Sequence, residues 1–246
     1  MGTGISLSEL RTDRSMLGRK TFLLSTGAIV GSAIAMHGSG AALAANGEGQ
    51  MQASDVLAAL KAGNHRYATD HSTNCNNNFD RRAEVSEAQQ PHAIVLGCSD
   101  SRVPPEVVFD QRLGDMFTIR IAGNIADAPA IGSIEYAVAH FSSPLLVVLG
   151  HQNCGAVKAT IEAIEKHQSL PGNIASIVAA IRPAVEPLIG KPGDVLDLAI
   201  HANIRAVIQH LKASSTILTD AVKSDKLRIV GGYYRLSDGV VEIPTA

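Results

Sequence analysis

The chain has 246 residues, of which 46% are hydrophobic, so it is long and apolar enough for one or two globular domains with a large buried core. Its formal net charge of -2 and its 4% aromatic content, without tryptophan, exclude the basic, aromatic-rich surfaces that bind nucleic acid. Its three cysteines are an odd number, which argues against a disulfide framework and leaves room for metal or nucleophilic chemistry.

The first 45 residues differ in kind from the rest. A mildly basic opening precedes an uncharged stretch, Thr21 to Met36, that is short for a membrane span. "ALA" at residues 42–44 then fits the small-x-small pattern of signal-peptide cleavage. We therefore expect residues 1–45 to be a cleaved export signal that leaves no membrane span, and residues 46–246 to form a single domain.

The export route is indicated by the junction "GRKTFLL", which resembles a twin-arginine signal with Lys20 in place of the second arginine. This resemblance implies a periplasmic protein. An ordinary secretory signal and an uncleaved anchor are the alternatives.

The first segment after the signal is predicted to be helical. Residues 51–67 place apolar side chains at helical spacing, with Ser54 and Asp55 as candidates for the N-cap. The polar stretch "DHSTNCNNNFDRR" that follows is typical of a loop. It contains Cys75, which has no partner in the pattern and for which we predict no role.

Three apolar runs then indicate buried strands. They are "HAIVLGC", "MFTIRIA" and "PLLVVLGH", each rich in Val, Ile and Leu and bounded by turn residues. Between the second and third, residues 130–141 have the length and pattern of a crossover helix. The order strand, helix, strand favours a parallel sheet in which all three strands are fully buried.

The remaining chain continues this alternation. Residues 154–167 are predicted to be helical, residues 170–194 are broken by Pro and Gly, and residues 195–222 form a long helical region. A strand at "LRIVGGYYRL" and a hairpin at Asp238-Gly239 close the chain. The prediction is an α/β fold with a mainly parallel central sheet of about four strands, flanked by helices, and an antiparallel C-terminal edge strand.

Reactive side chains follow two of the predicted strands. Cys98 and Asp100 come after one strand, and His151 and Cys154 come after another, 53 positions later for the histidine. Ligands of such sheets bind at the carboxyl ends of the strands, so these four residues converge if the strands are neighbours. Two thiolates and an imidazole with one open position are a catalytic zinc arrangement, and Asp100 is a candidate fourth ligand.

Arg102 decides what Asp100 does. If the chain stays extended, the arginine faces the same way as the carboxylate and competes with the metal for it through a bidentate ion pair. Held in this way, Asp100 can accept a hydrogen bond from a zinc-bound hydroxide and orient it toward an electrophile, instead of binding the metal. Taken singly, each of these residues is more often a core cysteine, a strand-end histidine or a surface ion pair, but the joint pattern makes that interpretation improbable.

At these residues the chain resembles the β-class carbonic anhydrases. "CSDSRV" and "GHQNCGAV" match the two signature segments of that family, and "GNHRY", "SIEYAV" and "IVGGYYRLSDG" match supporting segments along nearly the whole mature chain. The resemblance implies that Cys98, His151 and Cys154 bind one zinc ion per subunit. It also implies that Asp100 and Arg102 form a catalytic dyad, and that the enzyme hydrates carbon dioxide reversibly to bicarbonate and a proton. In some members the matching aspartate moves onto the metal at lower pH.

The resemblance extends to the substrate pocket and to assembly. The plant-like subgroup lines its pocket with a glutamine, a phenylalanine and a tyrosine, which match Gln89, Phe117 and Tyr136 here. Because family members place these pockets at subunit interfaces, a homodimer or a higher homo-oligomer is expected. "RIAGN" stands where many members have "RNVAN", beside the pocket.

Two other functions remain open on the sequence. One is a hydrolase of a carbon dioxide analogue, such as carbon disulfide or carbonyl sulfide, built on the same fold and zinc site. The other is a non-catalytic zinc-binding module in which Asp100 permanently closes the metal, and the presence of Arg102 argues against it.

Overall fold

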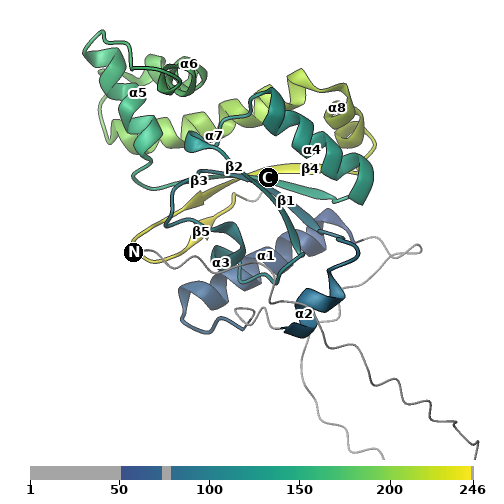
Figure 1. Ribbon diagram of the computed structural model, residues 1–246. Helices are drawn as coiled ribbons and strands as arrows, with labels where there is room; N and C mark the ends of the chain where they lie inside the picture. The colour runs from purple at the N-terminus through teal and green to yellow at the C-terminus, as the bar shows by residue number, and fades with distance from the viewer. Residues whose placement is uncertain (1–50, 74–78, 245–246) are drawn as a thin grey trace, which may run out of the picture. The chain divides into compact units, whose positions relative to one another are not determined.

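The computed structural model describes residues 51–73 and 79–244. The expected export signal and Cys75 lie outside these residues. Within them a five-stranded sheet has the order β2-β1-β3-β4-β5, and Figure 1 shows it between two layers of helices. The strands are β1 (Ala93–Gly97), β2 (Met116–Arg120), β3 (Leu145–His151), β4 (Arg228–Tyr234) and β5 (Val241–Glu242).

The strand directions match the expected fold class. β1, β2, β3 and β4 run parallel, and β5 pairs with β4 in the antiparallel direction. Gly239 adopts a φ of 75° in the connecting turn, a backbone conformation that glycine tolerates at no steric cost. The α/β prediction with a mainly parallel sheet and an antiparallel last strand is therefore confirmed.

The helices cover both faces of the sheet (Figure 1). One core holds buried side chains of α4 (Ala128–Phe141), α5 (Gly155–Glu165), α6 (Ile174–Val185), α7 (Val195–Ser214) and α8 (Thr216–Lys223). The opposite core holds side chains of α1 (Ala53–Ala68) and α3 (Pro105–Val108). The remaining short elements are α2 (Phe79–Glu84) and the 3₁₀ turns η1 (Ala122–Asn124) and η2 (Glu186–Leu188).

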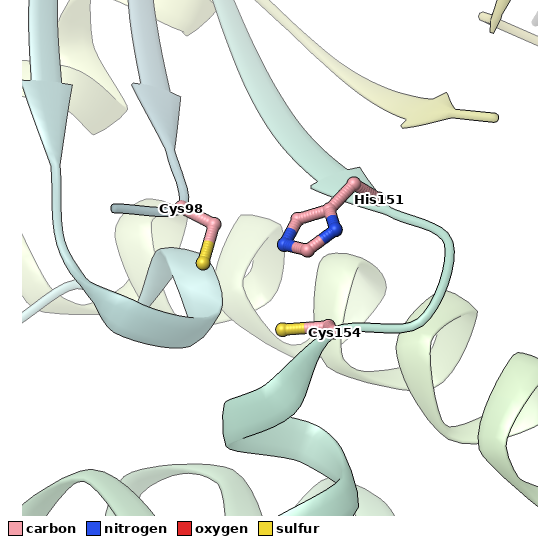
Figure 2. A group of neighbouring side chains, drawn as sticks. All are labelled: Cys98, His151 and Cys154. Carbon is pink, nitrogen blue, oxygen red and sulfur yellow. The ribbon is translucent and has the colours of Figure 1, made fainter. Parts of the chain in front are cut away.

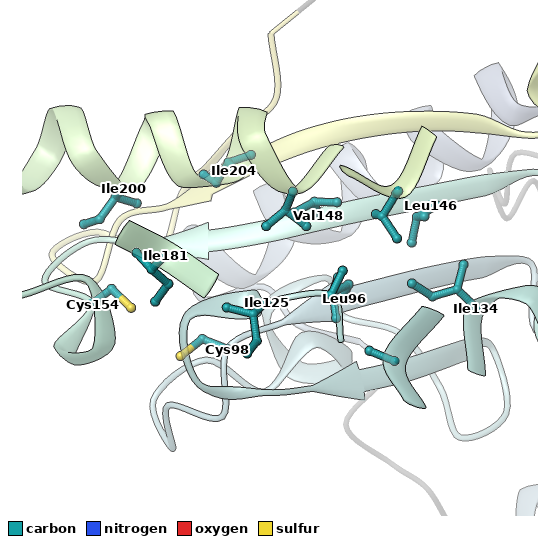
Figure 3. Close-up of a cluster of buried hydrophobic side chains, with 14 of the residues drawn as sticks. Leu96, Cys98, Ile125, Ile134, Leu146, Val148, Cys154, Ile181, Ile200 and Ile204 are labelled. Atoms are coloured by element: carbon teal, nitrogen blue, oxygen red, sulfur yellow. The ribbon is translucent and has the colours of Figure 1, made fainter. Parts of the chain in front are cut away.

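The central strands divide their side chains between these two cores. Ile94 and Leu96 of β1 lie in the core of α4 to α8, whereas Val95 lies in the core of α1 and α3. This alternation follows from the two-residue period of a strand that is buried on both faces. Figure 3 shows the first core, with Cys98 and Cys154 at the end of the apolar cluster. The thiols are thus positioned by the packed interior.

Several sequence predictions about single elements were wrong. β2 is an edge strand and is only partly buried, because only β1 pairs with it. The helix predicted over residues 195–222 is divided at Ser215, whose side chain caps α8 by accepting a hydrogen bond from the Leu218 N–H. Helix α1 is preceded by Gln52, not capped by Ser54 or Asp55.

Three helices were not predicted at all. The Pro/Gly-punctuated stretch contains α6, which packs Ile181 and Val185 into the core. The residues "FDRR", expected to be a loop, lie in α2, and the short helix α3 follows Pro104. Among the described residues, no helix combines the length and the apolar composition that crossing a membrane requires.

Candidate metal centre and its catalytic dyad

The site begins where β1 ends. Cys98 follows Gly97 directly and is 5% exposed, while Asp100 and Arg102 continue the loop toward solvent. Strand β3 is the neighbour of β1, with Gly97 opposite Leu149, so the ends of the two strands lie side by side. The condition on which the sequence prediction depended, that these strands are neighbours, is met.

The second half of the site follows β3. His151 is the last residue of that strand and is fully buried, and Cys154 is the N-cap of α5. Between them Asn153 adopts a left-handed φ of 56°, which turns the chain sharply from strand to helix. Figure 2 shows both sulfur atoms and the imidazole directed toward one common space.

These three side chains fit a metal ion. Their ligand atoms lie within 4.8 Å of one another, and all three residues are buried. His151 Nδ1 lies 2.9 Å from the carbonyl oxygen of Gln152, so it donates there and leaves Nε2 free to bind. Nε2 is one of two buried side-chain nitrogen atoms in the described residues that lack a hydrogen-bond partner, the other being Asn124 Nδ2. A buried, unpaired nitrogen beside two thiols is explained by a soft or borderline metal cation.

The thiols interact strongly with each other. The hydrogen bond between them lowers the pKa of Cys98 to about 4, against the opposing effect of burial, and His151 and the Gly123 N–H add to the stabilisation of its thiolate. The same pairing with Cys98, together with burial, raises the pKa of Cys154. Burial opposes the charged form of His151, but the hydrogen bond to Cys98 and its charge, together with Gln152 and Asp100, outweigh burial and raise the pKa of the imidazole. The thiolate is the form of cysteine that binds a metal, so the surroundings of Cys98 favour its ligating form.

Asp100 stands beside this cluster and is held by Arg102. Arg102 Nε donates to Oδ1 over 2.9 Å, Nη2 donates to Oδ2 over 2.7 Å, and the Arg102 main-chain N–H also donates to Oδ1. The hydrogen bonds from Arg102 hold the pKa of the Asp100 carboxyl well below its usual range. Oδ2 lies 3.8 Å from His151 Nε2. The carboxylate is therefore ionised and adjacent to the metal-binding atoms, with both of its oxygens bound by the arginine.

Three supporting residues were not singled out from the sequence. Arg120, at the end of β2, donates to the carbonyl oxygens of Cys98 and Asp100 over 3.0 Å and 2.5 Å and so fixes the loop that carries both residues. The Gly123 N–H donates to Cys98 Sγ over 3.3 Å, and the carbonyl of Gly123 accepts from Asn203 Nδ2 over 2.8 Å. The detectable signals were an arginine in an apolar strand and an asparagine on the apolar face of a helix.

The residues assigned to the substrate pocket lie away from the metal-binding residues of the same chain. Phe117 pairs with Ile94, four residues before Cys98, and its ring is 6.3 Å from that of Tyr136 on α4. Gln89 and Tyr136 line one surface groove, together with Phe141, and none of the three metal-binding residues lines it. The structure thus brings the three pocket residues together, but at the amino end of the strands instead of the carboxyl end.

Comparison with known proteins agrees with this geometry. The model of the carbonic anhydrase family matches residues 93–241, from β1 to β5. A carbonic anhydrase from Mycolicibacterium smegmatis is 40% identical over 187 residues, which cover 75% of this chain and 90% of that protein.

Solved structures share the fold. The β-carbonic anhydrase from Coccomyxa, solved in complex with acetazolamide, superimposes with a TM-score of 0.59 at 26% identity, over 76% of this chain and 85% of that one. A structure from a study of two tetrameric β-carbonic anhydrases of Sordaria macrospora superimposes with a TM-score of 0.60 at 22% identity, over 78% and 95%. The metal cluster built from two neighbouring strands, the adjacent ionised carboxylate and these matches together show that the chain belongs to the β-class carbonic anhydrases.

Proposed function

We propose that the metal is zinc, one ion per subunit, held by Cys98, His151 and Cys154, and that the enzyme hydrates carbon dioxide reversibly to bicarbonate and a proton. The observation that carries this proposal is the unpaired, buried Nε2 of His151 between two thiols, with an ionised carboxylate 3.8 Å away. Three ligands of this chemistry leave one coordination position of a tetrahedral zinc open, as catalytic zinc sites do.

Zinc at this site would supply a hydroxide nucleophile near neutral pH by lowering the pKa of water. The protein's task is to orient that nucleophile and to keep its own charges in place. Asp100 is kept ionised by its low pKa, so it accepts a hydrogen bond from the nucleophile. This bond directs a lone pair of the nucleophile toward the substrate carbon. Arg102 offsets the added negative charge and holds both carboxylate oxygens, so Asp100 does not become a fourth ligand. We assign the catalytic role to Asp100 and Arg102 on this basis.

The substrate pocket is proposed to form between subunits. Within one chain, Gln89, Phe117 and Tyr136 lie near the amino ends of the strands, away from the metal-binding residues, and Tyr136 is 49% exposed. A shared pocket requires a partner chain that covers this groove and places its own metal centre beside these residues. We therefore propose a homodimer or a higher homo-oligomer, which analytical ultracentrifugation of wild type and Tyr136→Ala would test. A Tyr136→Ala protein that keeps both its assembly state and its KM for carbon dioxide would contradict the shared pocket.

The test of the activity is a stopped-flow assay of carbon dioxide hydration, with zinc analysis of the same samples and with carbon disulfide and carbonyl sulfide as competitors. We expect zinc-dependent hydration that acetazolamide inhibits, since that compound is bound in the Coccomyxa structure. Turnover of carbon disulfide or carbonyl sulfide without carbon dioxide hydration would instead identify a hydrolase of a substrate analogue. A zinc-loaded protein without either activity would indicate a non-catalytic zinc module.

Export is proposed from the sequence of residues 1–45, with the periplasm as destination. Cell fractionation of wild type and of an Arg19→Gln variant tests it, because loss of the arginine of the "GRKTFLL" junction should retain a twin-arginine substrate in the cytoplasm. Export of both proteins would favour an ordinary secretory signal.

A further inference from the structure

His151 is oriented by the residue that follows it. The Nδ1 atom of its ring donates to the Gln152 carbonyl oxygen over 2.9 Å, which fixes the tautomer with a free Nε2 and fixes the rotation of the ring. The position of that carbonyl therefore determines where Nε2 lies. A histidine that is fully buried at the end of a strand has no solvent to replace this contact.

Gln152 is itself held from two sides by the hairpin that joins β4 to β5. Its main-chain N–H donates to the Tyr234 carbonyl oxygen over 2.8 Å, continuing the β3–β4 ladder past the last paired residues. Its side-chain Oε1 accepts from the Leu236 N–H over 3.1 Å. The first bond needs only a backbone at position 152, whereas the second needs a side chain that carries an acceptor of this length.

The hairpin is fixed by hydrogen bonds to α1 and by ion pairs between its own side chains. Asn64 of α1 donates to the Gly239 carbonyl over 2.8 Å and accepts from the Val241 N–H over 2.8 Å. On the exposed side, Arg235 forms ion pairs with Asp238 and Glu242. The contact between Gln152 and Leu236 thus connects a metal-binding histidine to a turn that is fixed at both of its sides.

We propose that the Gln152 side chain is a positioning residue for the metal centre. By binding the Leu236 N–H, it fixes residue 152, whose carbonyl in turn fixes the imidazole of His151 for the cation. This inference rests on the proposed zinc site. Outer residues that orient a metal-binding histidine typically change metal affinity by 10- to 100-fold when they are replaced. The side chain itself need not touch metal or substrate.

The test compares substitutions at one position. Gln152→Met keeps the length and removes the acceptor, whereas Gln152→Glu keeps an acceptor for the Leu236 N–H. Gln152→Asn, one methylene shorter, serves if the methionine variant does not fold. Tyr67→Phe is the matched control. It removes a contact of 3.2 Å to the hydroxyl of Tyr234, the residue at which the hairpin begins, and does not involve the Gln152 side chain. The zinc dissociation constant is measured by competition with a chromophoric chelator, and the coordination geometry from the visible spectrum of the Co²⁺-loaded proteins.

We expect Gln152→Met to weaken zinc binding by about 10-fold or more and to broaden the Co²⁺ spectrum, with Gln152→Glu and Tyr67→Phe within about 3-fold of wild type. Equal zinc affinity in wild type and in the folded methionine or asparagine variant would overturn the proposal, as would equal losses in Gln152→Glu and Gln152→Met. A wild-type protein that binds no zinc would instead overturn the proposed function. The two failures are therefore distinguishable.

Discussion

Arg102 binds both carboxylate oxygens of Asp100, with Nε 2.9 Å from Oδ1 and Nη2 2.7 Å from Oδ2. The arginine side chain is 56% exposed and the aspartate side chain 16% exposed, so the pair reaches from solvent to the buried metal cluster. An exposed ion pair of this kind contributes little to folding stability. In the proposed mechanism, its geometry decides whether the carboxylate stays with the arginine or moves onto the metal.

Replacing the carboxylate should separate metal binding from catalysis. In Asp100→Ala and Asp100→Asn we expect wild-type zinc content, because the three metal-binding residues are untouched, and a loss of about 10²- to 10⁴-fold in kcat, because the nucleophile is no longer oriented. Stopped-flow hydration with parallel zinc analysis measures both. Full activity in a zinc-loaded Asp100→Ala protein would rule out the catalytic role of this residue.

Replacing the arginine should release the carboxylate toward the metal. Asp100 Oδ2 lies 3.8 Å from His151 Nε2, so in Arg102→Ala only a small movement is needed for it to bind the cation. We expect low activity, and a Co²⁺ spectrum that reports an added carboxylate ligand. The double variant Asp100→Asn/Arg102→Ala is the control, because the amide is a poor ligand and its spectrum should be that of wild type. Identical spectra for the single and double variants would argue against a competing position for Asp100.

Removing a metal-binding side chain should abolish zinc binding. Cys98→Ser and His151→Ala each leave two of the three ligands, and we expect less than one tenth of the wild-type zinc content after dialysis. Cys75→Ser is the control, since no role is predicted for that thiol. Zinc content by atomic absorption decides the matter, and loss of zinc in Cys75→Ser together with retention in Cys98→Ser would reverse the assignment of the cysteines.

Two glycines near Cys98 should differ sharply in their tolerance of a methyl group. In Gly123→Ala the new Cβ would lie 2.6 Å from Ile181 Cδ1, in a residue with a φ of 71°, so we expect a loss of about 2 to 4 kcal/mol in the free energy of unfolding. In Gly97→Ala the nearest side-chain atom is 3.7 Å away, an ordinary contact, and we expect a change below about 1 kcal/mol. Urea unfolding of the two variants measures the difference. Equal stability would show that Gly123 is not sterically required.

The free energy of unfolding should fall in alkaline solution because of the titration of Tyr233. Burial, followed by the hydrogen bond from its hydroxyl to Asp197 Oδ1 over 2.5 Å, raises the pKa of Tyr233 above its ordinary value of 10.0. The folded state therefore keeps a proton that the unfolded state loses, so this contribution is fully present below pH 10 and is lost as the pH rises further. Tyr233→Phe should flatten the decline in unfolding free energy between pH 9 and pH 11. An unchanged slope would place the effect elsewhere, for example at Tyr234, whose pKa burial also raises.

The metal cluster could be predicted from the sequence because it depends on few facts. Cys98 directly follows a strand, and His151 and Cys154 end and follow another, so the parallel pairing of those strands was enough to bring them together. The hydrogen bonds from Arg120 depend on β2 lying next to β1 at the sheet edge, and the bond from Asn203 depends on α7 lying close enough to η1 to reach the Gly123 carbonyl. Both residues are unusual where they stand, an arginine in an apolar strand and an asparagine on the apolar face of a helix, but the sequence does not indicate their partners, because each bond joins elements that are distant in the chain. Helix α6 was not predicted because the Pro and Gly residues around it are typical of a loop.

The pairing of β1 with β3 also has a consequence for the order in which the protein matures. Cys98 comes from one strand and the other two metal-binding residues from its neighbour, with a complete crossover helix between them. No short peptide of the chain therefore contains the whole ligand set, in contrast to zinc fingers, where a brief segment folds around its ion. Slow, non-local sheet formation must come first, and the cation can bind tightly only afterwards. Metal uptake during refolding should consequently lag behind the appearance of secondary structure and report that these two strands have paired in the correct register.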